Sequence, residues 1–347
     1  MKPYIIPIFI PHMGCPHRCV YCNQSEITGE RLPSLKKIKE IIDFFLLRKV
    51  HVKREKPEIA FYGGSFTALK SLKRRAFLAL AFDYVKKGKI KGIRISTRPD
   101  ALDEKILNEL LSYGVKTIEL GVQALDEDIL KTARRGHSVK DVFKATKMIK
   151  AAEFSLGWQL MIGLPKETEN TLQRMVKEVL KWRPDFVRIY PTVVLKGTLL
   201  AKWWKEGKYK PLNIEEAVEI CKTLVMTFEG AGIKVIRVGL QPTTSLNKAI
   251  LAGPWHPAFG ELVKAAIFRE KMVEILKTFE GKEIDILVSP KIVSQCMGQK
   301  KENYLFLKQI FPKKRIAILP DMSLKKEEIK IVVKDGKRWS NANCCLW

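Results

Sequence analysis

Three cysteines stand close together near the start of the chain, at Cys15, Cys19 and Cys22. Three thiolates on one short loop can bind three irons of a cubane [4Fe–4S] cluster, whereas an electron-transfer cluster takes four. One iron then stays open for another ligand, as catalytic metal sites keep a free position. A structural zinc site that adds His12 or His17 is the alternative. Zinc sites favour two separated C-x2-C pairs, and this segment contains one.

The elements that must hold this loop follow a regular alternation of strand and helix. Apolar runs predict strands over residues 4–10, 57–62, 90–95, 115–120, 156–162, 186–190 and 234–238, with helical spacing between them. Such alternation indicates parallel βαβ units, and six or seven units in series predict a partial (β/α)6-type TIM barrel. A doubly wound dinucleotide fold is disfavoured because no G-x-G-x-x-G follows the first strand.

Helix boundaries can be expected at particular residues. Asp103 is suited to cap the helix that follows it, and Gly114 is suited to end that helix. Residues 126–152 should be helical with a break near Gly136.

Unusual residues gather where the predicted strands end. In barrels of parallel strands the carboxyl ends of the strands meet at one mouth, where the chemistry takes place. Each segment alone is weak evidence for a functional site, since paired glycines usually make a turn and a lone arginine is usually a surface charge. Their conjunction with the cysteines points to one site. The segments are Gly63-Gly64-Ser65, Thr97-Arg98, Glu119 to Gln123, Gly163-Leu164-Pro165 and Arg188 to Pro191.

These strand ends lie within longer characteristic segments: FYGGSFTAL, RISTRPDAL, IELGVQALD, ARRGH, MIGLPKET and RIYPTVVLKGT. Over residues 1–240 the chain resembles the core of the radical S-adenosylmethionine (SAM) superfamily, in the branch that contains the Elongator catalytic subunit. That branch is related to the oxygen-independent coproporphyrinogen oxidases. The resemblance implies that Cys15, Cys19 and Cys22 bind the cluster, that SAM chelates its open iron, and that Tyr21 packs beside it.

The resemblance also implies a SAM site. Gly63 and Gly64 match the position whose backbone receives the SAM amino group, and Ser65 stands where many members carry Glu. The other implied SAM contacts are Arg98, Glu119 and Gln123 for the carboxylate and ribose, and Ile162, Gly163, Tyr190 and Pro191 for the adenine.

Residues 241–347 should form a separate α+β extension. A helix is expected over 259–279 and strands over 283–288, 315–319 and 328–333, with a helix between them. This resembles the C-terminal part of short, Elongator-like bacterial radical SAM proteins. An acetyltransferase domain is not expected in so short a stretch, and no cobalamin signature is present. Cys221 should lie in the core, while Cys296, Cys344 and Cys345 have poor spacing for a second cluster.

The charge suggests a polyanionic partner. The chain has 63 Lys and Arg against 37 Asp and Glu, a net charge of +26, which is typical of nucleic-acid binding and most simply of tRNA. Basic clusters fall in residues 36–39, 48–56, 73–75, 86–91 and 313–315. A solvated, lysine-rich surface is the alternative.

The cellular setting is expected to be cytoplasmic. No apolar run reaches the ~18 residues of a membrane helix, so no membrane partner is expected. The apolar start of the chain contains two prolines and no cleavage site, so it reads as a first buried strand. Seven cysteines in a chain this long do not suggest a disulfide framework.

The function implied by the resemblance is reductive cleavage of SAM to a 5′-deoxyadenosyl radical, with tRNA as the substrate to be modified. A one-electron donor such as flavodoxin or ferredoxin is implied as well. Two alternatives stay open: a non-catalytic RNA-binding protein with a structural metal site, and a radical SAM enzyme that acts on a small molecule. Formation of 5′-deoxyadenosine separates the first alternative from the enzyme.

Overall fold

The computed structural model describes residues 4–24, 33–48, 56–325, 328–335 and 338–345, and it describes side chains up to residue 333. Contacts divide the chain into two units, and each is described by itself. The first comprises Met1–Ile214 and Ile233–Trp255, and the second comprises Glu215–Gly232 and His256–Trp347. The expected domain boundary at residue 240 stays a prediction. The division by contacts differs from it, since it groups residues 215–232 with the second unit.

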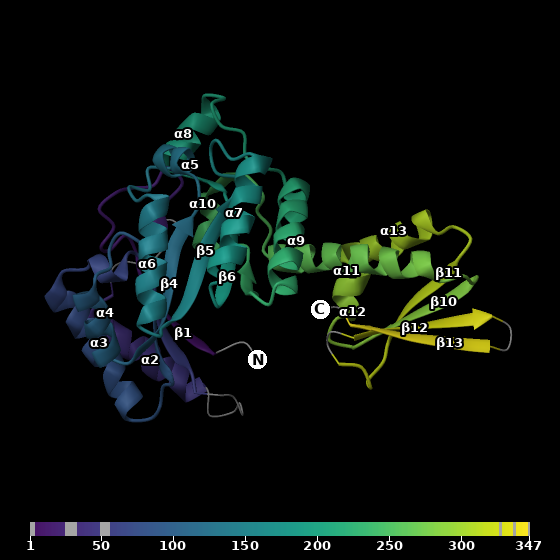
Figure 1. Cartoon of the computed structure of the whole chain (residues 1–347), viewed down its shortest axis with the longest axis horizontal. Helices are drawn as coiled ribbons and strands as arrows, with labels where there is room; N and C mark the ends of the chain where they lie inside the picture. Colours follow the sequence, from purple (N-terminus) through teal and green to yellow (C-terminus); the bar gives the residue numbers. More distant parts are fainter. Residues whose placement is uncertain (1–3, 25–32, 49–55, 326–327, 336–337, 346–347) are drawn as a thin grey trace. The chain divides into compact units, whose positions relative to one another are not determined.

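The first unit is built on seven parallel strands whose spatial order follows the chain (Figure 1). Each strand pairs in parallel with its neighbours. This arrangement confirms the predicted partial barrel and its last repeat strand. The strands are β1 (Ile5–Ile10), β2 (Glu58–Gly63), β3 (Gly92–Thr97), β4 (Val115–Gln123), β5 (Ser155–Ile162), β6 (Phe186–Pro191) and β8 (Lys234–Val238).

Helices follow the strands along the chain, and Figure 1 shows α6 and α7 in front of β4 to β6. They are α2 (Leu35–Arg48), α3 (Ser71–Lys86), α4 (Glu104–Ser112), α5 (Glu127–Thr132), α6 (Val139–Ala151) and α7 (Glu169–Trp182).

Local sequence signals set several helix ends. The side chain of Asp103 accepts a hydrogen bond from the Ile106 amide over 2.7 Å, so the expected cap is present. Gly114 follows α4 with φ of +70°, a conformation that glycine adopts without a steric penalty. Ser138 and Thr168 form capping boxes at the starts of α6 and α7.

The two faces of the sheet differ in chemistry. Apolar side chains on one face pack against the helices: the ring of Phe61 in β2 stacks on Phe77 of α3, and Trp158 in β5 donates to Thr146 of α6. Alternate positions on the other face are polar, with Arg94 and Glu119 buried there. Since side chains alternate along a strand, the same strands supply the core and the lining of the barrel.

Short elements that the sequence pattern did not predict follow β6. Strand β7 (Val194–Leu195) pairs antiparallel with β9 (Ile250–Ala252). Helix α8 (Leu199–Lys205) lies after β7, and α10 (Thr244–Ala249) precedes β9. They fall in loops with too few residues for a periodic pattern to be recognised.

The second unit pairs helices with a four-stranded sheet of order β11-β10-β12-β13. Strand β10 runs parallel to β11 and antiparallel to β12. The expected helix and three strands are present, and β13 was not expected. The elements are α9 (Ile214–Gly230), α11 (Phe259–Thr278), β10 (Glu283–Val288), α12 (Val293–Met297), α13 (Glu302–Ile310), β11 (Arg315–Pro320), β12 (Glu328–Asp335) and β13 (Arg338–Cys345).

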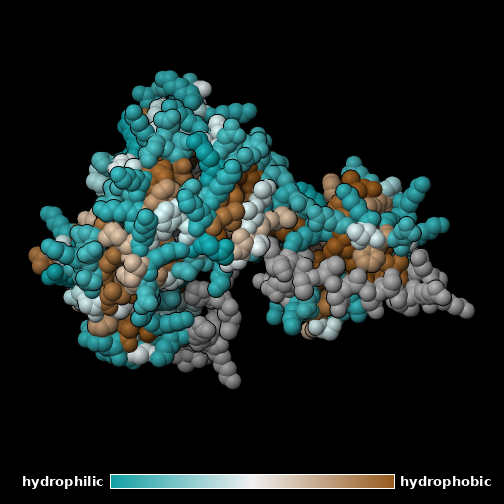
Figure 2. Space-filling model, in the orientation of Figure 1, coloured by the Kyte–Doolittle hydropathy of each residue, from teal (hydrophilic) through white to brown (hydrophobic). Residues whose placement is uncertain are grey.

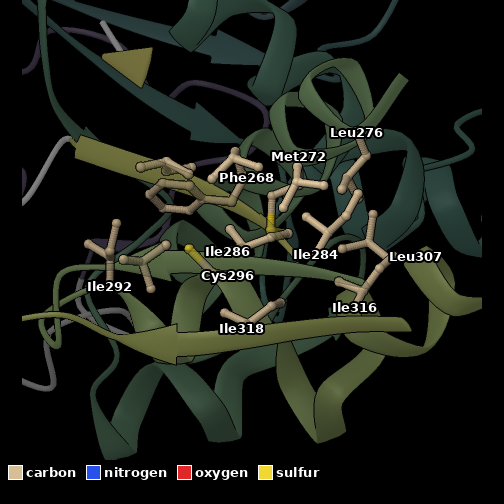
Figure 3. Packing of buried hydrophobic residues seen from close by; sticks show 14 residues of the cluster. Phe268, Met272, Leu276, Ile284, Ile286, Ile292, Cys296, Leu307, Ile316 and Ile318 are labelled. Carbon is tan, nitrogen blue, oxygen red and sulfur yellow. The ribbon is translucent and has the colours of Figure 1, made fainter. Parts of the chain in front are cut away.

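The second unit has its own apolar core. Phe268 and Met272 of α11 pack against Ile284 and Ile286 of β10 (Figure 3). Cys296 is fully buried in this core, and burial raises the pKa of its thiol to about 12. Cys296 therefore has a packing role. In the described parts of the chain, no helix is long and apolar enough to cross a membrane.

Candidate cofactor site at the barrel mouth

The cysteine loop leaves the end of β1 and folds back over the end of β2. The Ser65 amide donates to the Met13 carbonyl over 2.7 Å, and the Val20 amide donates to the Ala133 carbonyl over 3.1 Å. Cys15, Cys19 and Cys22 are all half-buried on this loop. Their thiols thus lie at the barrel mouth, on the strand ends where the sequence placed the chemistry.

Two glycines allow this close packing. A Cβ on Gly14 would overlap the Ser65 carbonyl, and a Cβ on Gly64 would overlap the Met13 carbonyl. Gly63 has φ of +105°, which glycine alone adopts easily. Gly64 therefore has a packing reason in addition to the ligand-binding one expected from the sequence. The expected contact of its backbone with SAM stays a prediction.

Gln24 closes the loop at its far end. Its amide side chain donates to the Gly63 carbonyl and accepts from the His12 amide. In return, Nε2 of His12 accepts a hydrogen bond from the Gln24 amide over 2.9 Å. This nitrogen of His12 is therefore engaged in the fold, which disfavours the zinc alternative that used His12 as a ligand.

Arg135 brings a buried positive charge to the cysteines. Its NH1 group donates to Sγ of Cys19 over 3.1 Å and to the hydroxyl of Tyr21 over 3.4 Å, and its NH2 group donates to the Gly121 carbonyl over 2.7 Å. Arg135 is 8% exposed, and no acidic side chain of the described residues forms an ion pair with it. A buried cation without a counter-charge is costly, so the surroundings suit a negatively charged group.

Without a metal, burial favours the protonated form of the Cys15 and Cys22 thiols. Burial, followed by the charges of Cys19 and Cys15, raises the pKa of Cys22 to about 12. Burial and Cys19 also raise the pKa of Cys15, against the opposing effect of Arg135. Iron must therefore displace protons when it binds, because thiolates are the ligands.

The end of β4 presents Gln123 beside Arg135. The pairing of β4 with β5 shifts register between Leu120 and Gln123, and Gln123 takes φ of +68°. A Cβ on Gly121 would lie 3.0 Å from Nε2 of Gln123 and 3.2 Å from NH2 of Arg135. At this bulge the Gly121 carbonyl accepts from Arg135, and the predicted Gln123 lies near the same guanidinium.

Ser65 and Arg98 join the ends of β2 and β3. Oγ of Ser65 accepts from the Arg98 amide over 3.2 Å and lies 3.0 Å from Oγ1 of Thr97. The Arg98 guanidinium makes two hydrogen bonds to Asp100, over 2.9 and 2.8 Å. Both predicted residues lie at the mouth, but their polar groups already have partners in the protein.

Glu119 is the centre of a buried network on the polar face of the sheet. Arg188 donates to both of its oxygens, over 2.7 and 3.0 Å, and Arg94 donates to Oε1 over 3.0 Å. Gln159 and Tyr62 add hydrogen bonds over 2.9 and 3.2 Å. Although burial alone raises the pKa of a carboxyl, Arg188 and Arg94 lower the pKa of Glu119. Glu119 thus organises the barrel lining, and its expected contact with SAM stays a prediction.

The ends of β5 and β6 form the opposite side of the mouth. The Ile162 carbonyl accepts from the amide and the hydroxyl of Thr192, over 2.9 and 2.7 Å. The Gly163 amide donates to Glu167 over 2.5 Å, and the Gly163 carbonyl accepts from Tyr209 over 2.6 Å. The backbone groups of both predicted residues are therefore fixed by neighbours.

Tyr21 and Tyr190 pack against one apolar cluster, which includes Leu130, Met161 and Leu164. Pro191 follows Tyr190 and pairs in register with Ile162. The structure thereby brings the aromatic residue of the cysteine loop next to the strand ends predicted for adenine.

Several polar residues at the site were not singled out from the sequence. Arg135 lies in the ARRGH segment, which was noted as a motif without a role for each residue. Its neighbour His137 is 6% exposed, and burial together with Arg135 and Arg98 lowers the pKa of His137 to about 3. The signal that would have identified these residues is their burial next to the cysteine loop. Only the fold shows that they lie there.

Comparison with known proteins identifies the family of this chain. Residues 9–179 match the model of the Radical SAM superfamily, and residues 184–269 match that of the Radical_SAM C-terminal domain. Together these ranges span about three quarters of the chain. The fold and the cysteine loop define a radical SAM protein, and the chain belongs to the radical SAM superfamily.

Within the superfamily the chain is similar to Elongator-type proteins. It is 29% identical over 255 residues to the tRNA uridine(34) acetyltransferase of Methanocaldococcus infernus, covering 62% of this chain and 48% of that protein. It is 30% identical over 254 residues to human Elongator complex protein 3, covering 60% of this chain and 46% of that protein. The chain thus spans about half the length of these relatives.

A solved structure supports the fold. The archaeal Methanocaldococcus infernus Elp3 with residues 1–46 deleted has a TM-score of 0.60 and 23% identity, over 96% of this chain and 74% of that chain. This similarity concerns the architecture.

Proposed function

We propose that this protein is a radical SAM enzyme that binds a [4Fe–4S] cluster through Cys15, Cys19 and Cys22 and cleaves SAM to modify tRNA. The observation that carries the proposal is the position of Arg135. This buried guanidinium, without an acidic partner among the described residues, donates to Cys19. A cluster with thiolate ligands supplies the negative charge that the surroundings of Arg135 lack.

When bound, the cluster and SAM supply a one-electron reduction that breaks a carbon–sulfur bond and yields a 5′-deoxyadenosyl radical. The chain's own residues would bind and orient the cluster and SAM. Cys15, Cys19 and Cys22 would each bind one iron, and Arg135 would hold Cys19 in place. Tyr21 covers the loop from the side of the apolar cluster and helps to exclude water.

The proposed SAM site spans the mouth. The backbone of Gly63 and Gly64 would receive the amino group, with Ser65 fixing the turn. The carboxylate and ribose would lie toward Arg98, Gln123 and the Glu119 network, and the adenine would lie toward Ile162, Gly163, Tyr190 and Pro191. Because Arg98 and Glu119 already have protein partners, Gln123 is the predicted side chain best suited to a direct contact.

The proposal of tRNA rests on two supports. The net charge of +26 suits a polyanion, and several relatives are tRNA uridine(34) acetyltransferases. Acetyl transfer is not part of the function proposed for this chain. The proposal includes a one-electron donor such as flavodoxin or ferredoxin, and a cytoplasmic location.

Anaerobic reconstitution tests the proposal. The expected product holds about four irons with an EPR signal that changes when SAM is added, and reduced protein releases 5′-deoxyadenosine and methionine. Cys19→Ala should lose iron and SAM cleavage together, whereas Cys221→Ala, in the second unit, should keep both. Protein that binds zinc tightly and forms no iron–sulfur chromophore would refute the radical SAM activity and favour the RNA-binding alternative.

Comparison of tRNA nucleosides from wild-type and deletion strains tests the substrate. A modified nucleoside that disappears in the deletion strain and returns with the active gene supports tRNA. Unchanged nucleosides together with SAM cleavage in vitro would favour a small-molecule substrate.

A further inference from the structure

Residues 196–210, here called the α8 rim, are rich in both lysine and tryptophan. They contain five lysines, Trp203, Trp204 and a single acidic residue, Glu206. Lys202, Lys205 and Lys208 are exposed, and both tryptophans are half-buried. Glu206 pairs with Lys202 and Lys208, over 3.8 and 2.8 Å. The rim therefore keeps a clear excess of positive charge.

The rim is attached directly to the cysteine loop. The Leu200 amide donates to the Val20 carbonyl over 2.8 Å, and the side chain of Asn23 donates to the Lys196 carbonyl over 3.0 Å. Val20 packs in one apolar cluster with Leu200, and Tyr21 packs against the same cluster.

The rim also reaches the other side of the mouth. At its far end, the hydroxyl of Tyr209 donates to the Gly163 carbonyl. The rim thus runs along the mouth from the cysteine loop to the end of β5. The end of the first unit at which Figure 1 labels α8 is mostly hydrophilic in Figure 2.

We propose that the α8 rim is the surface on which an RNA strand is held beside the cysteine loop. This inference rests on the proposed function and names the place where its partner binds. The lysines contact phosphates, and the exposed edge of Trp203 or Trp204 stacks on an unpaired base.

The chemistry of the rim favours RNA over other anions. An acidic protein or a sulfated polysaccharide would satisfy the lysines but would leave the indole rings without a stacking partner. A base in a duplex is hidden from chemistry, so an enzyme acts on a base that is unpaired or turned out of the stack. A stacking platform beside the reacting centre serves this requirement.

The lysines are tested by a triple variant, Lys202→Ala, Lys205→Ala and Lys208→Ala. The matched control is Lys87→Ala, Lys89→Ala and Lys91→Ala, three exposed lysines before β3, at the opposite end of the strands. Affinity for tRNA is measured at several salt concentrations. Each lost phosphate contact should reduce the log–log salt slope by about 0.7 to 0.9. The slope of the rim variant, which lacks three lysines, should therefore fall by about 2.1 to 2.7, and the slope of the control should stay near that of wild type.

The tryptophans are tested separately with tRNA and with heparin, a polyanion without bases. Trp203→Leu or Trp204→Leu should weaken tRNA binding between about fivefold and about a hundredfold and leave heparin binding unchanged. Trp→Phe at the same position should restore most of the affinity, because a phenyl ring also stacks. Thermal unfolding of each variant shows whether the rim has kept its packing.

The outcomes separate the two proposals. If wild-type protein prefers tRNA to heparin but the rim and control variants lose affinity equally, the α8 rim is not the RNA surface and the proposed function stands. Equal losses for tRNA and heparin in the Trp→Leu variants overturn the stacking role. Wild-type protein that binds tRNA no more tightly than heparin removes tRNA from the proposed function and removes this inference with it.

Discussion

The guanidinium of Arg135 donates a hydrogen bond of 3.1 Å to Sγ of Cys19, a residue that lies 116 positions earlier in the chain. A second hydrogen bond ties the same guanidinium to the Gly121 carbonyl at the end of β4. Arg135 therefore fixes the middle cysteine of the loop to the barrel and sets a positive charge beside it.

Replacement of Arg135 tests this link. Arg135→Gln should weaken iron retention by roughly ten- to a hundredfold, because a hydrogen bond to a charged group contributes about 1.5–3 kcal/mol. The midpoint potential of the remaining cluster should become more negative, since a nearby positive charge favours the reduced form. Iron analysis and EPR-monitored redox titration measure both effects. An unchanged potential would show that the positive charge does not act on the cluster. Arg134→Gln, at the adjacent exposed arginine, is the matched control.

Gly64→Ala should damage the cysteine loop itself. Its Cβ would overlap the Met13 carbonyl, which is backbone and cannot turn away. We expect a lower melting temperature and loss of cluster binding together. Gly230→Ala, where a Cβ meets open space, should be neutral or slightly stabilising. A Gly64→Ala protein that keeps its cluster but no longer binds SAM would instead point to a ligand-facing role without a packing role.

Glu167 should make stability depend on pH. Burial raises the pKa of Glu167 to about 7, above its unfolded value of ~4.3. A raised pKa in the folded state means that the stabilisation is full below pH ~4 and is lost as pH rises through 7. The loss is roughly 4 kcal/mol.

Glu167→Gln removes this dependence. The amide oxygen of the glutamine can still accept from the Gly163 amide. Denaturant unfolding should show that the free energy of unfolding of the variant rises relative to that of wild type from pH 5 to pH 8. Glu169→Gln, at an exposed position in α7, should track wild type. Parallel curves for Glu167→Gln and wild type would contradict the raised pKa.

The burial of Arg74 contradicts the expectation that residues 73–75 form a basic surface. Residues 73–75 were interpreted as part of a basic surface, but Arg74 is 8% exposed and donates to the Thr67 and Leu69 carbonyls and to Glu109. Arg74→Ala should lower the free energy of unfolding by ~3–5 kcal/mol, because Glu109 and two carbonyls lose a donor. Arg75→Ala should change it by less than ~1 kcal/mol, because the Arg75 side chain is 60% exposed. Denaturant unfolding of both variants checks the difference.

The sequence by itself determined the repeating architecture and the place of the chemistry. Alternating apolar strands and helices require parallel units, and the carboxyl ends of such strands meet at one mouth whatever the details of packing. Local signals were sufficient at Asp103 and Gly114, because a cap and a positive φ depend on a few neighbouring residues. The spacing of Cys15, Cys19 and Cys22 was visible for the same reason.

Only the tertiary structure decided what surrounds those residues. The contact of Arg135 with Cys19, the arginines around Glu119 and the packing reason for Gly64 join segments that lie far apart in the chain. From the sequence alone, an arginine is interpreted as a surface charge. Only the fold shows that Arg74 and Arg135 are buried. Which charge is buried, and against what, is set by the closing of the sheet and the folding of its loops over the mouth, and a linear pattern does not contain that geometry.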